Sequence, residues 1–393
     1  MIRRARSQHA GRRLSELTAV LRARPGALPM LAGRTAEQAD SVIQLARRHG
    51  VEAWLAGCAP LTEPAWAELA RQRPRFLAAQ ARSLAAVREF GGLADRAGVR
   101  WLVLKGPALA HSVYPRPDLR HYVDLDLLVA PTDFERVLAE LEAAGYHLVD
   151  RNWPLLARER PGELRLRSPR GVLLDLHWSI FNDATRRASF DAPTADLLDR
   201  SRVLAAGFPA LSAADQLVHV GLHAALSGAN RLGWLLDAHL AAGATGDGPS
   251  DDRPDWPAVL AAAGRIGAGP SLAVVLGRTS RLLSTAVARE VLVELAGGRG
   301  WLALAGGLDR LSPLQDDPAR PALARSVARS VRATGPSSAR ELTRHAWLWV
   351  RSGAGRRYVR PAWLDADNPA SAMLDVPDPA ARQRYLAAVA DSR

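Results

Sequence analysis

The chain has 393 residues, of which 48% are hydrophobic and 23% charged, as is usual for folded, water-soluble proteins. This length predicts two or three domains. The net charge of +12 allows an anionic partner such as a nucleotide, tRNA or an acidic surface, or equally an arginine-rich surface that faces water. One cysteine excludes a disulfide within the chain and a multi-cysteine metal site, and no apolar run has membrane-spanning length, so we expect a cytoplasmic protein.

Residues 1–98 predict a helical region that begins with a basic, mobile arm and has no apolar signal core. Helices are expected from Thr35 to His49, from Thr62 with Pro64 in the first turn, and from Pro74 to Ala97. Because no residue in this region suggests chemistry, we interpret it as a helical platform.

From Val99 the pattern changes to short apolar strands and helices, which predicts a mixed core over residues 99–205. Lys105-Gly106-Pro107 forms the turn between a strand and a helix. The expected elements are strands at 99–104, 123–129, 146–150, 163–167 and 172–178, and helices at 108–113 and 131–144.

Residues 206–393 predict a C-terminal helical region. Its expected parts are helices at 215–227, 232–242, 256–304 and 379–390, a loop at 243–254, and a basic segment at 320–360. Arg325, Arg329 and Arg332 are expected on one helix face, which would either bind RNA or an acidic protein or simply face water.

Two aspartates stand two residues apart in the strand expected at 123–129. Asp124 and Asp126 would leave the same face of this strand, while Val123 and its alternate neighbours face the core. Adjacent carboxylates repel unless a cation lies between them, and oxygen ligands favour Mg²⁺ or Mn²⁺. The alternative is a solvated strand face that binds nothing.

Asp175 is a third acid in an otherwise apolar strand, and His177 shares its face. Three carboxylates on neighbouring strands suit two cations and in-line phosphoryl transfer, with Asp175 placed to take the proton of an attacking hydroxyl. The alternative is a salt bridge from Asp175 to Arg165 or Arg167 on the hairpin partner.

Lys105 is the one lysine among 52 Lys and Arg residues, which suggests a site that needs a compact point charge. Gly106 allows the backbone to approach a phosphate, and Pro107 suits the first position of a helix whose N–H groups face an anion. The turn therefore suggests phosphate binding, with an ordinary strand-to-helix turn as the alternative.

The spacing of His219 and His223 is that of two zinc ligands on a helix. No third ligand is evident nearby in the sequence. A histidine pair that faces a cleft or packs in the core is therefore the preferred interpretation.

Five motifs together resemble a bacterial nucleotidyltransferase family of unassigned substrate, within the DNA polymerase β-like superfamily. The resemblance covers about residues 75–240 and rests on Lys105-Gly106-Pro-Ala-Leu-Ala, Tyr114-Pro-x-Pro-x-Leu-Arg120, Asp124-Leu-Asp126-Leu-Leu-Val, Leu141-x-x-x-Gly145-Tyr146 and Leu174-Asp175-Leu-His177-Trp178. One departure is that superfamily members usually carry Gly-Ser or Gly-Gly at the turn, where this chain has Gly106-Pro107.

The resemblance implies an α+β fold, in which a small mixed sheet forms a polymerase β-like core between helical regions. It also implies that Asp124, Asp126 and Asp175 bind metal, and that Lys105 and Gly106 contact the triphosphate. Arg120 lies in a matching motif and is expected to reach a phosphate, unless it is an ordinary surface arginine. Three further residues resemble the family's helical follow-on and are expected near the base, the ribose or the acceptor: His223, Arg231 and Asp237.

The function expected from these features is Mg²⁺-dependent transfer of a nucleoside monophosphate from an NTP, with ATP favoured, to an acceptor hydroxyl. Pyrophosphate would leave, and the acceptor would be a small molecule or natural product, a protein or an RNA. Two alternatives stay open: a non-catalytic module that binds nucleotide or RNA, and a toxin-type transferase that acts on tRNA.

Overall fold

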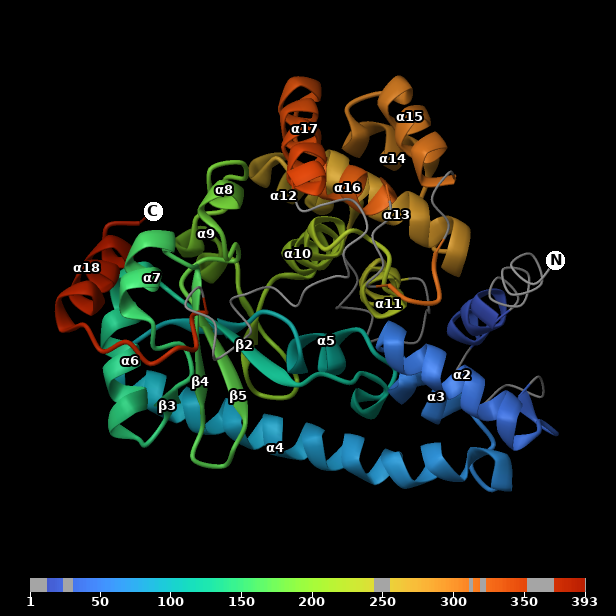
Figure 1. Ribbon diagram of the computed structural model, residues 1–393, viewed down its shortest axis with the longest axis horizontal. Coiled ribbons are helices and arrows are strands. Elements are labelled where there is room, and N and C mark those ends of the chain that lie inside the picture. The colour runs from blue at the N-terminus through green and yellow to red at the C-terminus, as the bar shows by residue number, and fades with distance from the viewer. Residues whose placement is uncertain are drawn as a thin grey trace. The chain divides into compact units, whose positions relative to one another are not determined.

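The computed structural model describes residues 13–23, 31–243, 255–310, 314–318, 323–351 and 371–392 (Figure 1). They divide into two compact units that interleave along the chain. The helical unit draws on segments 1–78, 112–121 and 213–356, and the α/β unit on segments 79–111, 122–212 and 357–393. The predicted domain boundaries at 98/99 and 205/206 stay predictions. The predicted N-terminal arm and most of the predicted loop at 243–254 lie outside the described residues.

The α/β unit contains one mixed sheet, which confirms the predicted α+β fold. Its strands are β1 (Trp101–Val103), β2 (Asp124–Val129), β3 (His147–Leu148), β4 (Glu163–Arg167), β5 (Leu173–His177), β6 (Arg202–Val203) and β7 (Pro209–Ala210). The strand order is β3-β4-β5-β2-β1-β7-β6. β2 runs parallel to β5 and β1 runs parallel to β7, while the other neighbours are antiparallel.

One face of the sheet forms the main core, because alternate residues of β2, β4 and β5 are leucine or valine. The buried residues packed on this face come from α4 (Ala67–Ala97), α6 (Phe134–Ala143), α7 (Trp153–Glu159) and α18 (Pro379–Ala390). Tyr385 of α18 meets the rings of Phe134 and Trp153 at centroid distances of 6.3 and 6.2 Å. The last helix therefore belongs to the core of the α/β unit, beside α6 and α7 (Figure 1).

The opposite face of the sheet is polar over β4, β5 and β2. Its side chains alternate with the core leucines and are Glu163, Arg165, Asp175, His177, Asp124 and Asp126. Where this face is apolar, Leu102 and Leu128 pack with leucines of α9 (Thr194–Asp199). The expectation that Val123 faces the core is wrong, because Val123 precedes β2 and is 68% exposed.

Several short elements connect these strands. They are α5 (Pro107–Ser112), η3 (Pro117–Leu119), η4 (Pro131–Asp133) and α8 (Ala184–Arg187). The predicted start of the long helix at Pro74 is wrong, since α4 already begins at Ala67 and continues through that proline. Burial of Leu69 and Phe76 on either side of Pro74 gives both turns a packed face, which offsets the lost backbone hydrogen bond.

The helical unit contains a helix over residues 13–22, followed by α2 (Ala36–His49), where Thr35 and Gln38 form a reciprocal capping box. Its other helices are α3 (Glu52–Cys58), η2 (Pro64–Trp66), α10 (Ala213–Leu226), α11 (Leu232–Ala241), α12 (Trp256–Ile266), α13 (Gly269–Leu283), α14 (Arg289–Ala296), α15 (Arg299–Arg310), α16 (Leu323–Ser330) and α17 (Gly335–Arg351). Cys58 is buried and forms no disulfide. Across the described ranges, no helix is both long and apolar enough to cross a membrane.

The basic segment at 320–360 does not form the predicted arginine stripe. The helix α16 ends at Ser330, so Arg332 lies beyond it. The Arg332 side chain is buried, and its Nη1 donates to the carbonyl oxygens of Arg329 and Val331 at 2.7 and 2.9 Å. Arg332 thus caps the end of a helix, as basic side chains often do. The side chain of Arg325 lies outside the described part of the chain.

Candidate active site

The glycine turn after β1 lies against the start of the acidic strand. Gly106 has a φ of +48°, in the left-handed region that favours glycine. A Cβ atom at this position would lie 3.4 Å from the carbonyl oxygen of Asp124. The Leu104 N–H also donates to the carbonyl oxygen of Asp126 at 3.0 Å. These backbone contacts bring Lys105 to the strand that carries both aspartates.

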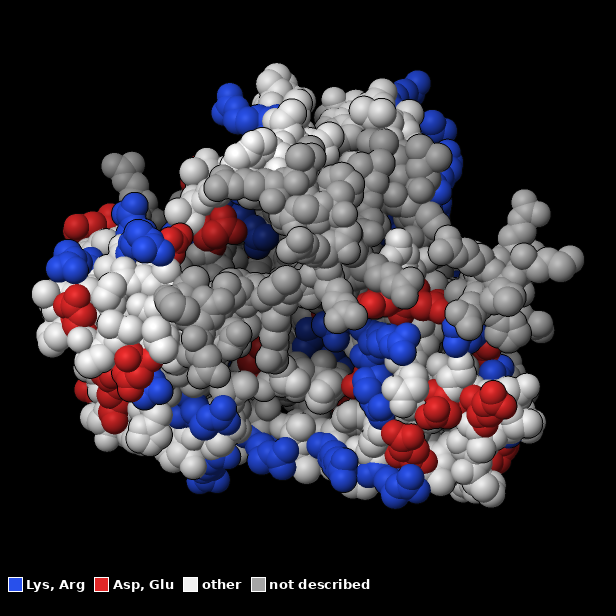
Figure 2. Space-filling model, in the orientation of Figure 1, with Lys and Arg blue, Asp and Glu red and all other residues white. Residues whose placement is uncertain are grey.

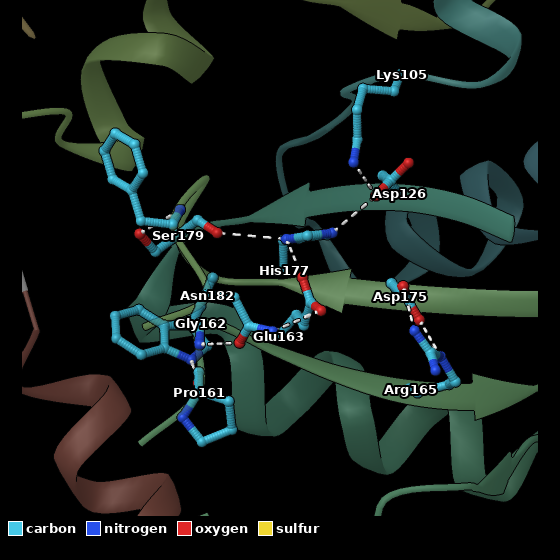
Figure 3. A network of polar contacts seen from close by, with 12 residues as sticks. Lys105, Asp126, Pro161, Gly162, Glu163, Arg165, Asp175, His177, Ser179 and Asn182 are labelled. Carbon is cyan, nitrogen blue, oxygen red and sulfur yellow. Dashed lines mark hydrogen bonds and ion pairs between the residues drawn. The ribbon is translucent and has the colours of Figure 1, made fainter. Parts of the chain in front are cut away.

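Asp126 receives two side-chain donors on one carboxylate oxygen. The Nζ atom of Lys105 lies 2.8 Å from Oδ1, and Nε2 of His177 lies 3.2 Å from the same atom (Figure 3). Burial alone would raise the pKa of the Asp126 carboxyl, but the Lys105 charge and the His177 hydrogen bond hold that pKa well below its usual range. Burial would lower the pKa of Lys105, but the charge and hydrogen bond of Asp126, together with the charges of Glu163 and Asp124, outweigh burial and raise it. The pair is therefore ionised across the neutral range.

His177 connects acidic side chains on the two strands that flank β5. Its Nδ1 atom lies 3.2 Å from Oε2 of Glu163 and 3.3 Å from the carbonyl oxygen of Ser179. With both nitrogens protonated, the ring donates towards Asp126 from Nε2 and towards Glu163 and Ser179 from Nδ1. Although burial lowers the pKa of His177, the charge of Glu163 and the Asp126 contacts raise it above its ordinary value. Burial in turn raises the pKa of Glu163 to about 6.

Asp175 is held by Arg165, one of the two arginines that the sequence offered as salt-bridge partners. The two residues lie opposite each other on β5 and β4, and Asp175 is also the register partner of Asp126 on β2. Nε of Arg165 donates to Oδ1 of Asp175 at 2.8 Å and Nη2 donates to Oδ2 at 3.1 Å. The hydrogen bond with Asp175 raises the pKa of Arg165 further. Both oxygens of the third acid are thus engaged.

Asp124 is the least restrained of the three acids. It begins β2 and is half-buried, and its carboxylate has no hydrogen bond or ion pair with the described residues. Burial raises the pKa of its carboxyl to about 6, and the charges of Asp126 and Asp175 contribute in the same direction. This repulsion shows that the three carboxylates share one electrostatic environment.

The arrangement suits a magnesium ion that takes few protein ligands. Among the residues that the structure describes, no group of three or more His, Cys, Asp or Glu side chains is spaced to hold a metal. The Asp124 carboxylate and Oδ2 of Asp126 accept no hydrogen bond from described residues, and both are hard oxygen donors. Mg²⁺ is commonly held by one or two carboxylates, with substrate phosphates and water completing its shell. The two aspartates of β2 fit this pattern, whereas Asp175 is occupied by Arg165.

Arg120 and Asp237, which were predicted to contact a phosphate and the base, ribose or acceptor, pair with each other in the helical unit. Arg120 donates from Nε and Nη2 to the two carboxylate oxygens of Asp237, each at 2.9 Å. The Tyr114 hydroxyl donates to Oδ1 of Asp237 at 2.7 Å. This bidentate pair is largely buried, so Arg120 is not the surface arginine considered as an alternative.

The other two predicted site residues of the helical unit, His223 and Arg231, lie around Trp234. The guanidinium of Arg231 stands 5.6 Å from the centre of the Trp234 ring, and the His223 ring meets it edge-on at 5.7 Å. Burial lowers the pKa of Arg231. His219 is buried on the same helix as His223, and neither belongs to a metal-binding cluster within the described chain.

The structure thus divides the nine predicted site residues between the two units. The α/β unit holds Lys105, Gly106, Asp124, Asp126 and Asp175, and the helical unit holds Arg120, His223, Arg231 and Asp237. Sequence reasoning assigned no role to Glu163 or Tyr114. The signal for Glu163 was the period-two alternation of strand 163–167, which places it on the face of Asp175.

A row of exposed arginines follows α4. Basic side chains gather along the lower edge of the face in Figure 2, over this helix. Arg71, Arg75, Arg82 and Arg96 share one side of it by helical spacing, are exposed, and form no ion pair with described residues. They extend over about 37 Å of helix.

Comparison with known proteins identifies the family of the chain. No curated protein matches it. A family described as an uncharacterised nucleotidyltransferase matches residues 35–284, from the N-cap of α2 to the C-cap of α13. This match covers more than half of the chain and includes the glycine turn and all three acids. The chain therefore belongs to this nucleotidyltransferase family.

Proposed function

We propose that the protein transfers a nucleoside monophosphate from an NTP, with ATP as the favoured donor, to an acceptor hydroxyl in a reaction that depends on Mg²⁺ or Mn²⁺. The observation that carries the proposal is the set of three acids on one face of two neighbouring parallel strands, beside a glycine turn. Membership of a nucleotidyltransferase family supports the reaction class.

In this proposal, Asp124 and Asp126 hold the metal ion. When bound, the ion would neutralise charge on the triphosphate and on the leaving pyrophosphate. Lys105 would exchange its contact with Asp126 for a phosphate oxygen, and the missing side chain of Gly106 would allow the phosphates to approach the turn. Arg120 would have to leave Asp237 to reach a phosphate, so we assign the pair a supporting role in the helical unit.

Asp175 would accept the proton of the acceptor hydroxyl. The hydroxyl oxygen would form a bond to the α-phosphorus, the bond between this phosphorus and the bridging oxygen would break, and pyrophosphate would leave. Arg165 orients the Asp175 carboxylate through two hydrogen bonds, and a general base must be held in position in this way. For Asp175 to act as a third metal ligand, one of the two Arg165 hydrogen bonds would have to be released.

The arginines of α4 make RNA the first acceptor to test. Four exposed arginines without acidic partners suit the phosphates of a polynucleotide. If RNA binds there, replacing Arg71, Arg75, Arg82 and Arg96 by glutamine would weaken binding and reduce the slope of log affinity against log salt by about 3 to 4.

The deciding experiment incubates the full chain with each α-³²P-labelled NTP, Mg²⁺ and separate RNA, protein and small-molecule fractions of a lysate. Transfer should appear with one fraction, require the metal, and be lost in Asp124→Asn and Asp126→Asn. Asp199→Asn is the matched control, because Asp199 is an exposed acid of the same unit. Label in no fraction would favour a binding module, and unchanged transfer by both aspartate variants would overturn the site.

A further inference from the structure

We propose that Glu163 and His177 form a positioning pair that locks Asp126, leaving one of its carboxylate oxygens for the ligand. This inference rests on the proposed function of Asp126 as a metal ligand. Neither residue is assigned a role by the family match.

The first observation is an asymmetry between the two oxygens of Asp126. Lys105 and His177 approach from β1 and β5, yet both donate to Oδ1 (Figure 3). Oδ2 receives no hydrogen bond from the residues that the structure describes. A carboxylate held at one oxygen from two sides cannot rotate freely, so the direction of Oδ2 is fixed.

The second observation is that the other ring nitrogen of His177, Nδ1, is also restrained by contacts. Its Nδ1 atom faces Oε2 of Glu163 at 3.2 Å and the carbonyl oxygen of Ser179 at 3.3 Å. Glu163 is held by Asn182, whose Nδ2 donates to Oε1 at 2.9 Å. The contacts therefore continue from Asn182 through Glu163 and His177 to Asp126, across β4, β5 and β2.

The two donors on Asp126 differ in what they can do. Lys105 extends from a turn on a flexible stem, and its side chain is 20% exposed. The ring of His177 is 5% exposed and is restrained at both nitrogens. When the Lys105 ammonium moves to a phosphate, His177 remains as the donor that keeps Asp126 in place. Groups behind a metal ligand typically contribute 10- to 100-fold to metal affinity or activity.

The test compares two substitutions that separate the two ring nitrogens. In His177→Gln, the side-chain amide reaches as far as Nε2 and can still donate to Asp126. In His177→Asn, the amide reaches only as far as Nδ1, so it keeps the contact with Ser179 and loses Asp126. Both variants keep a polar side chain of similar shape. His147→Asn is the matched control, because His147 is exposed on the edge strand β3.

Mn²⁺ binding to the full chain is measured by electron paramagnetic resonance, first alone and then with a non-hydrolysable α,β-methylene NTP. We expect His177→Asn to weaken binding by about 10- to 100-fold, and His177→Gln to stay within a few-fold of wild type. The gap between the two should widen with the nucleotide bound, because Lys105 then leaves Asp126. In turnover assays His177→Asn should lower kcat more than it changes KM for the NTP.

Substitution of Glu163 provides an independent test. Glu163→Leu should weaken Mn²⁺ binding in the same direction, and combining it with His177→Asn should add little further loss. Equal binding by His177→Asn and His177→Gln, or fully additive losses, would overturn the positioning pair. If Asp124→Asn removes Mn²⁺ binding while the His177 variants do not differ, this inference alone fails. If Asp124→Asn also binds Mn²⁺ normally, the proposed metal site itself fails.

Discussion

Lys105→Met tests whether the ion pair with Asp126 holds the acidic strand in place. The change keeps the length of the side chain and removes its charge, so the buried Asp126 carboxylate loses the donor at 2.8 Å. Removing one partner of a buried ion pair typically costs about 3 to 5 kcal/mol, because the other charge stays desolvated. Since His177 still donates to the same oxygen, we expect the lower end of this range, about 3 kcal/mol.

The assay must report on the α/β unit alone, because two compact units need not unfold together. Amide hydrogen exchange, followed by mass spectrometry of peptides covering β2 and β5, gives local free energies of opening. A loss of about 3 kcal/mol corresponds to roughly a 100-fold loss of protection. Arg100→Met is the control, because its ion pair with Asp199 is 64% and 62% exposed and should be worth at most about 1 kcal/mol.

The pH dependence of this loss follows from the two shifted pKa values. Lys105 has a raised pKa in the folded state, so its contribution is complete below the unfolded pKa of about 10.4 and is lost as pH rises through the folded value. Asp126 has a lowered pKa, so its contribution is complete above about pH 3.9 and is lost as pH falls. The charge of Lys105 also acts on Asp124 and Glu163, whose pKa values are about 6. Above the titration of these two acids, the difference between wild type and Lys105→Met should therefore be the same at about pH 8 and about pH 9. A loss no larger than that of Arg100→Met at neutral pH would refute the reasoning.

Three further predictions concern single residues. Asp124→Asn should stabilise the α/β unit by about 1 to 2 kcal/mol at neutral pH, because an acid whose pKa is raised to about 6 resists ionisation in the folded state. Measured by hydrogen exchange, this gain should vanish below about pH 4. A destabilised variant would contradict the prediction. Gly106→Ala should cost about 1 to 2 kcal/mol, since an L-residue at φ +48° is strained, and an unchanged opening free energy of β1 and β2 would count against the turn geometry. Tyr114→Phe should destabilise the helical unit by about 1.5 to 3 kcal/mol through the lost hydrogen bond to Asp237. Urea unfolding, followed by hydrogen exchange in α11, measures this loss of stability. An effect near zero would show that Arg120 alone satisfies the Asp237 carboxylate.

Much of the α/β core could be predicted because its alternation is strong. The strands around Leu125, Leu164 and Leu174, the hairpin, and the glycine turn all lie where local pattern and turn chemistry place them. Local pattern failed where tertiary packing overrides it. Examples are α4, which continues through Pro74 because its flanking residues are buried, and Val123, which stands outside the strand.

The sequence by itself determined which faces carry the acids, since period-two alternation places Asp124 and Asp126 on one side of β2 and Asp175 on the corresponding side of β5. It did not determine their partners. Arg165 and Arg167 are equivalent in pattern, and only the register of β4 with β5 sets Arg165 opposite Asp175. The meeting of Lys105 and His177 at Asp126, and the contact of Glu163 with His177, likewise depend on strand order, because residues far apart in sequence become neighbours only when β4, β5 and β2 pair. Alternation fixes the direction of a side chain, and pairing between strands decides what that side chain meets.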